Sequence, residues 1–209
     1  MKTDYRSTLG AGAQNYYMPD LADHVLTTVP RNAAILETGC GRGHLLWWLH
    51  TNGYENLHGC DLDDFRDEEH RGLDFTKADL DQSGLPFADE SLDCVVSLHV
   101  VEHLENPWAY VREIRRVLRP SGRLLIAYPS AKDYISRVKF LWRADVPSFT
   151  PRNNHLSFFT AAVESKLFSG FRLRHTIHAP RSLPLIGGAR LRGSRLWSHK
   201  TLFDYERSV

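Results

Sequence analysis

A glycine-rich turn between an apolar stretch and an apolar helix constrains this chain more than any other feature. The segment AILETGCGRGHLLWWL carries Gly39, Gly41 and Gly43. A strand that runs through such a turn into a helix is typical of the switch point of an open parallel sheet, where a ligand approaches the main chain closely. His44 stands where the dinucleotide fingerprint G-x-G-x-x-G needs its third glycine, and no Lys-Ser or Lys-Thr pair follows. The dinucleotide-binding loop and the Walker loop, which both bind phosphate groups, are therefore disfavoured.

Strands and helices alternate around this turn. Apolar runs predict strands over residues 33–37, 57–61, 75–78, 92–98 and 123–128, and helices over 43–50 and 107–118. Asn106 and Pro107 are typical of the first turn of a helix. The order predicts a Rossmann-like, doubly wound α/β fold. Its sheet is expected to be mostly parallel and seven-stranded, with helices on both faces and an antiparallel last strand.

The length of 209 residues fits a single domain. We expect an N-terminal lid over residues 1–30, with a helix at 19–28 and with Tyr16, Tyr17 and Met18 covering the site. The cofactor-binding core spans 31–130. A substrate cap spans 131–209, with an amphipathic stretch at 134–142, a helix at 161–168, and strands at 171–178 and near 201–205. A loop broken by Pro184 and the pair Gly187-Gly188 spans 181–196.

Composition excludes several classes of protein. The chain is 42% hydrophobic and 24% charged, which excludes a disordered or disulfide-stapled chain. Neither a membrane-spanning run nor a signal peptide is visible. The cysteines Cys40, Cys60 and Cys94 lie in or beside expected strands, which predicts buried free thiols and a cytoplasmic location.

The net charge of +1 hides an internal asymmetry. Between positions 55 and 105 the chain has 15 acidic residues and three basic ones, whereas 165–203 has eight basic residues and no acidic one. The middle of the chain therefore suits a cationic ligand and the C-terminal part an anionic one.

Acidic residues follow or end the first three expected strands. Asp61 ends the second strand, 22 residues after Gly39, where a carboxylate accepts both ribose hydroxyls of a nucleoside. Glu37 precedes the turn, and a carboxylate there repels a pyrophosphate but attracts a cation. Asp79 follows the third strand, within reach of an adenine amino group.

Together these motifs resemble the class I S-adenosylmethionine-dependent methyltransferases, in the group that includes the small-molecule enzymes of quinone biosynthesis. ETGCGRG is similar to the first motif of that family and GCDL to the second. KADLDQSGLPFADESLDCVVSLHVVEHL is similar to its central stretch, and LRPSGRLLIAYP to the fifth strand with its lead-in turn. The resemblance covers roughly residues 33–130.

The resemblance implies an S-adenosylmethionine site at the carboxyl edge of the sheet. Gly39, Cys40, Gly41 and Gly43 would line the methionine part, with Glu37 supporting the loop. Asp61 would hold the ribose, and Leu62 would lie against the adenine, whose edge would contact Asp79 and Leu80. Leu98 and His99 would face the sulfonium. Ordinary core packing is the alternative for Leu62, Leu80 and Leu98.

The run His99-Val100-Val101-Glu102-His103 spells the inverted zinc-protease signature H-x-x-E-H. Zinc hydrolysis is disfavoured, because the run follows a strand directly and Pro107 leaves no long helix. Ubiquinone-type O-methyltransferases have a similar E-x-x-E-H run linked to a divalent cation. His99 replaces its first glutamate here, and a histidine disfavours Mg²⁺. We therefore expect no metal.

His103, and His155 in the cap, are the candidate catalytic residues, since a histidine accepts a proton near neutral pH. The expected reaction is methyl transfer to a hydroxyl of a small-molecule acceptor. Arginines at 190, 192 and 195 beside apolar residues favour an anionic or lipid-linked acceptor, or peripheral contact with an anionic membrane. We expect no nucleic-acid partner. The alternatives left open are an RNA or protein methyltransferase, a cofactor-binding regulatory protein without turnover, and a nicotinamide dehydrogenase.

Overall fold

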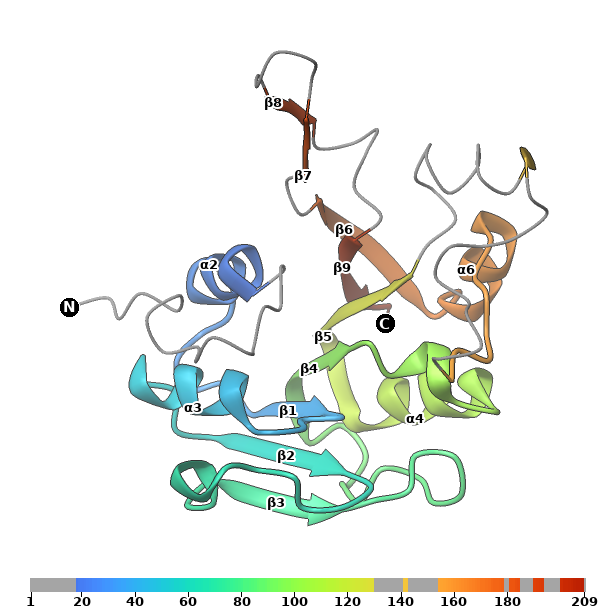
Figure 1. The fold of residues 1–209 in the computed structure, drawn as a ribbon. Coiled ribbons are helices and arrows are strands. Elements are labelled where there is room, and N and C mark those ends of the chain that lie inside the picture. Colours follow the sequence, from blue (N-terminus) through green and yellow to red (C-terminus); the bar gives the residue numbers. More distant parts are fainter. Residues whose placement is uncertain are drawn as a thin grey trace.

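A seven-stranded sheet forms the centre of the molecule (Figure 1). The computed structural model describes residues 18–129, 141–142, 154–178, 181–184, 190–193 and 200–208. The strands are β1 (Ile35–Thr38), β2 (Leu57–Asp61), β3 (Asp74–Lys77), β4 (Leu92–Leu98), β5 (Leu118–Pro129), β6 (Phe171–His178) and β9 (Lys200–Arg207), in the spatial order β3-β2-β1-β4-β5-β9-β6. All pairs among β1 to β5 are parallel, whereas β9 is antiparallel to both neighbours. The predicted fold class is confirmed.

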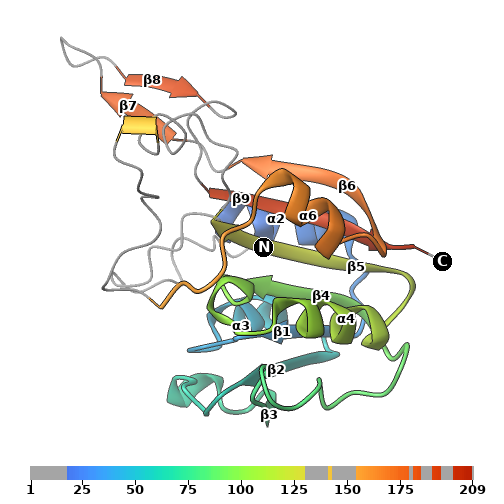
Figure 2. The same ribbon diagram turned by 90° about the vertical axis from the view of Figure 1, so that its right-hand side faces the viewer.

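Helices cover both faces of the sheet (Figures 1 and 2). α2 (Met18–Thr28) and α3 (His44–Thr51) lie on one face, and α4 (Pro107–Val117) and α6 (Ala161–Leu167) on the other. Because side chains alternate along a strand, each face has its own apolar core. In β5, Leu124 and Ile126 pack on the α4 side, whereas Leu125 and Ala127 pack on the α2 side. Two single-turn 3₁₀ helices, η1 (Glu68–His70) and η2 (Val101–His103), complete the described elements of the core.

A buried ion-pair cluster fastens α2 to the C-terminal half of the sheet. Asp204 on β9 is fully buried, and its Oδ2 lies 2.9 Å from Nε2 of His24 on α2. Its Oδ1 accepts a hydrogen bond from Nε of Arg123 on β5 at 2.8 Å. Burial alone would raise the pKa of Asp204, but the hydrogen bonds from His24 and Arg123 outweigh it and lower that pKa. The helix expected in the N-terminal lid is therefore held against the sheet.

The structure differs from the sequence expectations in two places. β5 begins at Leu118, which pairs with Leu92, so that the stretch expected to be only a turn already belongs to the strand. Within the expected loop 181–196, β7 (Arg181–Pro184) and β8 (Arg190–Gly193) form an antiparallel hairpin. Figures 1 and 2 show this hairpin projecting away from the large sheet beyond β6 and β9. Tyr16, Tyr17, Arg195 and most of the stretch 134–142 lie outside the described residues.

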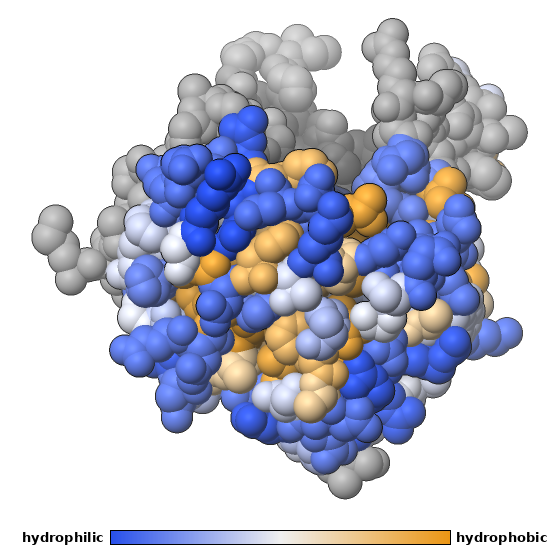
Figure 3. All heavy atoms as spheres, turned by 90° about the horizontal axis from the view of Figure 1, so that it is seen from below, coloured by the Kyte–Doolittle hydropathy of each residue, from blue (hydrophilic) through white to orange (hydrophobic). Residues whose placement is uncertain are grey.

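The surface below β3 is mostly hydrophilic, with apolar residues in smaller groups (Figure 3). β3 is a short edge strand of four residues, and its first and last residues are exposed. A short, polar edge disfavours pairing with another sheet. Among the described residues, no helix combines the length and the apolar character needed to cross a bilayer. Cys40, Cys60 and Cys94 are buried free thiols, as predicted.

Candidate cofactor-binding and active site

The carboxyl ends of β1 and β4 lie side by side and frame the candidate site. Their ladder ends with Thr38 paired to Ser97. The hydroxyl of Tyr110, from α4, lies 2.5 Å from Oγ1 of Thr38 and 2.8 Å from Oγ of Ser97. All three side chains are buried. This contact fixes the two strand ends from which the glycine turn and the H-x-x-E-H run leave the sheet.

The glycines of the turn have different neighbours. Gly39, Gly41 and Gly43 have φ values of +63°, +50° and +77°, in the left-handed region that favours glycine. A Cβ at Gly39 would lie 2.4 Å from Cγ2 of Val100, so the protein itself requires a glycine there. A Cβ at Gly43 would contact Arg66 and His70, whereas the space above Gly41 is open. A ligand therefore has room to approach the main chain at Gly41.

Asp61 is directed at this turn. Its Oδ2 accepts a hydrogen bond from the amide of Gly41 at 2.8 Å, and its Oδ1 accepts one from the amide of Leu62 at 2.7 Å. Leu62 is 59% exposed, so it is not a core residue. The sequence prediction that Asp61 and the glycine turn share one site agrees with these contacts.

Glu37 provides a second carboxylate beneath the turn. The residue is 6% exposed, and its Oε2 has no hydrogen-bond partner among the described residues. Burial first, and the nearby Asp61 second, raise the pKa of Glu37 well above its ordinary value. A buried acceptor atom beside a second acid favours a cationic ligand. The residues present thus fit a positively charged nucleoside with an open approach over Gly41.

Arg66 supports the loop after Asp61, and the sequence analysis did not single it out. Its guanidinium donates two hydrogen bonds to Asp64 and one to the carbonyl oxygen of Leu73. The contact with Arg66 lowers the pKa of Asp64 to about 2. Arg66 also lies over the ring of Phe75, 4.6 Å from its centroid. The available signal was its place as one of three basic residues in the acidic stretch 55–105.

Three other predicted cofactor residues have contacts within the protein. Burial raises the pKa of the Cys40 thiol, which disfavours a reactive thiolate. Asp79 is exposed, and its Oδ1 accepts hydrogen bonds from the amides of Asp81 at 3.0 Å and Gln82 at 3.3 Å, which caps the turn after β3. Leu80 is half-buried and packs against the α4-side core. An adenine contact by Asp79 or Leu80 stays a prediction.

The H-x-x-E-H run is not a continuous helix. β4 ends at Leu98, which is half-buried, and His99 has a φ of +59° before η2 begins at Val101. Nδ1 of His99 lies 2.9 Å from Oε1 of the fully buried Glu102. The two histidines of the run therefore do not share a helical face, which excludes the inverted zinc-protease arrangement.

The two candidate catalytic histidines lie against each other. The rings of His103 and His155 meet edge to face with centroids 4.8 Å apart, although 51 residues separate them. Nδ1 of His103 lies 3.2 Å from the carbonyl oxygen of Asn154. The segment that holds Asn154 and His155 thus contacts η2, and a catalytic role for either histidine stays a prediction. Ligand atoms of Glu102, His103 and His155 lie within 4.8 Å of one another, a spacing compatible with a metal ion. That this site works without a metal stays a prediction.

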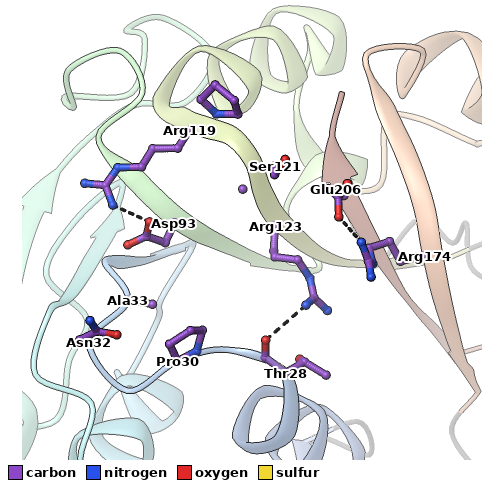
Figure 4. Close-up of a pocket in the computed structure, with 12 residues that line it drawn as sticks. Thr28, Pro30, Asn32, Ala33, Asp93, Arg119, Ser121, Arg123, Arg174 and Glu206 are labelled. Carbon is purple, nitrogen blue, oxygen red and sulfur yellow. Dashed lines mark hydrogen bonds and ion pairs between the residues drawn. The ribbon is translucent and has the colours of Figure 1, made fainter. Parts of the chain in front are cut away.

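A separate cavity of about 520 Å³ lies at the opposite edge of the sheet, where β4 and β5 begin (Figure 4). Its arginines already have acidic partners. Arg119 pairs with Asp93, Arg174 with Glu206, and Arg123 with Asp204. A cavity without surplus charge, far from the glycine turn, does not suit the predicted cofactor.

Known proteins resemble this chain in sequence and in fold. A family described as a methyltransferase domain matches residues 36–126. A protein of Mycolicibacterium smegmatis named a probable S-adenosylmethionine-dependent methyltransferase is 30% identical over 148 residues, which are 68% of this chain and 53% of that protein. The chain therefore spans about half the length of this relative.

Solved structures share the fold. An S-adenosylmethionine-dependent methyltransferase of Mesorhizobium loti matches with a TM-score of 0.61 and 17% identity, over 93% of this chain and 99% of that one. The cyclase SpnF matches with a TM-score of 0.63 and 14% identity, over 91% and 81%. The fold by itself therefore does not fix the reaction. The sequence matches over residues 36–126, together with the carboxylate-lined glycine turn, make this chain similar to the class I S-adenosylmethionine-dependent methyltransferases.

Proposed function

We propose that this protein transfers a methyl group from S-adenosylmethionine to a hydroxyl of a small acceptor that is anionic or partly apolar. The observation that carries the proposal is the pair of acids at the glycine turn. Oε2 of Glu37 is buried without a hydrogen-bond partner among the described residues, and Asp61 lies on the amide of Gly41. Bound S-adenosylmethionine supplies a methyl group on a positively charged sulfur.

The chain's own residues have separate tasks in this proposal. Asp61 exchanges its contacts with backbone amides for ribose hydroxyls, and Glu37 balances the positive charge of the ligand. The strand ends fixed by Tyr110 hold the reacting groups at near-attack distance. His103 and His155 border the acceptor and orient its hydroxyl.

The acceptor is expected to meet the cap and the hairpin. Positions 190 and 192 alternate with Leu191 along β8, so the two arginine positions share one face of the β7–β8 ladder. Arginines bind carboxylates and phosphates through paired hydrogen bonds. This pattern supports an acceptor that is an anionic metabolite or a lipid-linked precursor rather than a neutral molecule. A lipid-linked acceptor would bring the protein into peripheral contact with a membrane.

The first test is binding of S-adenosylhomocysteine, the demethylated cofactor, measured by titration calorimetry and thermal shift. The melting temperature of the wild type is expected to rise with ligand concentration. Asp61→Ala is expected to bind about ten- to a hundredfold more weakly, because it loses hydrogen bonds to a charged group. Asp63→Ala is the matched control, since Asp63 lies two residues away, is exposed and pairs with Lys77. Equal binding by both variants would contradict the proposed site.

The second test is transfer of a radiolabelled methyl group to a panel of hydroxyl metabolites with anionic or lipid-linked groups. Binding of S-adenosylhomocysteine without transfer to any acceptor would instead support a cofactor-binding regulatory protein. Transfer to RNA or protein, but not to small molecules, would overturn the proposed acceptor class.

A further inference from the structure

His99 and Glu102 form a histidine–carboxylate pair at the carboxyl edge of the sheet. Nδ1 of His99 lies 2.9 Å from Oε1 of Glu102, whose side chain is fully buried, whereas 32% of the His99 side chain is exposed. One end of the pair therefore lies inside the protein and the other reaches solvent at the site. Since Val100 packs over Gly39, His99 is one residue away from direct contact with the glycine turn.

The backbone holds His99 in an unfavourable conformation. Its φ of +59° is one of three positive values among the described non-glycine residues, with Glu90 and Ser121. The amide of His99 nevertheless donates to the carbonyl oxygen of Ala127 at 2.8 Å, so neighbouring strand β5 fixes this geometry. Such strain persists where the surrounding structure imposes it, often at functional sites.

Glu102 is held equally firmly. Its carbonyl oxygen accepts hydrogen bonds from the amides of Leu156 at 2.7 Å and Ser157 at 3.1 Å, which join η2 to the cap segment. These hydrogen bonds hold the main chain of Glu102, and full burial confines its side chain next to His99. A buried acid that orients an imidazole in this way fixes which ring nitrogen carries the proton.

We propose that His99 is the proton acceptor of the methyl transfer and that Glu102 is its positioning residue. In this proposal Nδ1 of His99 donates its hydrogen to Oε1 of Glu102, and the lone pair on Nε2 takes the proton of the acceptor. The O–H bond of the acceptor hydroxyl breaks and its proton moves to Nε2. The oxygen bonds to the methyl carbon, and the carbon–sulfur bond breaks with its electrons remaining on sulfur. The proton then leaves to water. This assignment rests on the proposed hydroxyl acceptor.

The contacts favour His99 over His103 as the base. Nδ1 of His103 meets a neutral carbonyl oxygen, that of Asn154, at the longer distance of 3.2 Å. A carboxylate stabilises the imidazolium that forms during proton transfer more strongly than a carbonyl does. His103 and His155 then contact the acceptor without taking its proton.

The tautomer of His99 provides a test that needs no acceptor. In the 209-residue chain with ¹⁵N-labelled histidine, wild-type His99 is expected to show the Nδ1–H form. The side-chain amide of Glu102→Gln can both donate and accept, so the population of the Nδ1–H form is expected to fall and that of the Nε2–H form to rise. His50→Gln, on exposed helix surface, is the control that leaves the His99 signals unchanged. An Nε2–H tautomer in the wild type would overturn the proposal.

Activity provides the second test once an acceptor is found. His99→Gly removes the imidazole and suits the left-handed backbone, so it is expected to fold. We expect kcat to fall by about 10²- to 10⁴-fold with little change in KM, and added imidazole to restore part of it. Ser121→Gly relieves the same kind of backbone strain at the opposite edge of the sheet, where it is expected to leave kcat unchanged.

The two proposals fail in different ways. Loss of S-adenosylhomocysteine binding in the wild type would contradict the methyltransferase assignment itself. Normal binding together with full kcat in His99→Gly would overturn only the role of His99. A large loss of kcat in His103→Gln but not in His99→Gly would assign the base to His103.

Discussion

Glu37 shows how a single residue can favour a ligand at the expense of stability. Burial and the nearby Asp61 raise its pKa, so the folded protein holds this proton more tightly than the unfolded chain. The folded state therefore loses stability as pH rises from the unfolded value of about 4.5 towards the raised one. Each pKa unit corresponds to about 1.4 kcal/mol.

Glu37→Gln is consequently expected to be more stable than the wild type at pH 8, and to match it near pH 4.5. Urea unfolding at both pH values measures this difference, with the exposed Glu55→Gln as control. The variant is also expected to bind S-adenosylmethionine more weakly, because the cation loses a charged partner. If Glu37→Gln were more stable than the wild type by the same amount at both pH values, the charge of Glu37 would not be what destabilises the folded state.

At this scale, sequence patterns are most informative where the chemistry is local. Glu37 is the penultimate residue of strand β1, Gly41 follows that strand, and Asp61 ends β2. The structure places Asp61 against Gly41, and the role of these residues in binding a cofactor stays a prediction. The pairing of His99 with Glu102 was not foreseen, because it depends on a positive φ at a non-glycine residue. No pattern of residue types reveals that conformation, which β5 imposes from 28 positions further along the chain.

At the scale of elements, the contact between α2 and the sheet depends on Asp204. Asp204→Ala is expected to lower the free energy of unfolding by about 3–5 kcal/mol, because it leaves the partly buried Arg123 without its partner. Below the unfolded pKa of about 3.8 the wild type loses this contribution as well, since the pKa of Asp204 is lowered in the fold. Chemical unfolding measures the change, and hydrogen exchange should show α2 opening first.

An exposed ion pair provides the contrast for Asp204. Glu68→Gln breaks a surface pair with Arg71 and is expected to change stability by less than about 1 kcal/mol. If Asp204→Ala were no more destabilising than this control, the buried cluster would not hold α2. The sequence predicted α2 itself but not this attachment, since the three residues are far apart in the chain.

Strand pairing also accounts for the β7–β8 hairpin, which the sequence did not predict. The β7–β8 hairpin has four residues in each strand, and Pro184 ends the first. A proline and a pair of glycines suggested an irregular loop. A proline is nevertheless tolerated at the end of a strand or on an edge, where its missing amide costs no ladder hydrogen bond.

For the whole molecule, the sheet order separates the charges that the sequence already shows as unequal. The acidic stretch 55–105 contains β2, β3 and β4, whereas the basic stretch 165–203 contains β6, β7 and β8. Because β3 and β6 are the two edge strands of the sheet, the acidic segment reaches one edge of the sheet and the basic segment the other. A cationic cofactor would then approach the site from the acidic half of the molecule, and an anionic acceptor from the basic half.

Replacing Arg190, Arg192 and Arg195 together by serine tests this division. The KM for an anionic acceptor is expected to rise roughly tenfold, since each exposed ion pair contributes about 0.2–1 kcal/mol. Binding of S-adenosylhomocysteine should not change, because its acids lie in the other half. The variant should also lose the rise of KM with salt that screening causes in the wild type. The double variant Arg71→Ser, Lys77→Ser removes positive charge from the acidic half as a control. An unchanged KM with unchanged salt dependence in the triple variant would mean that the basic half does not recognise the acceptor.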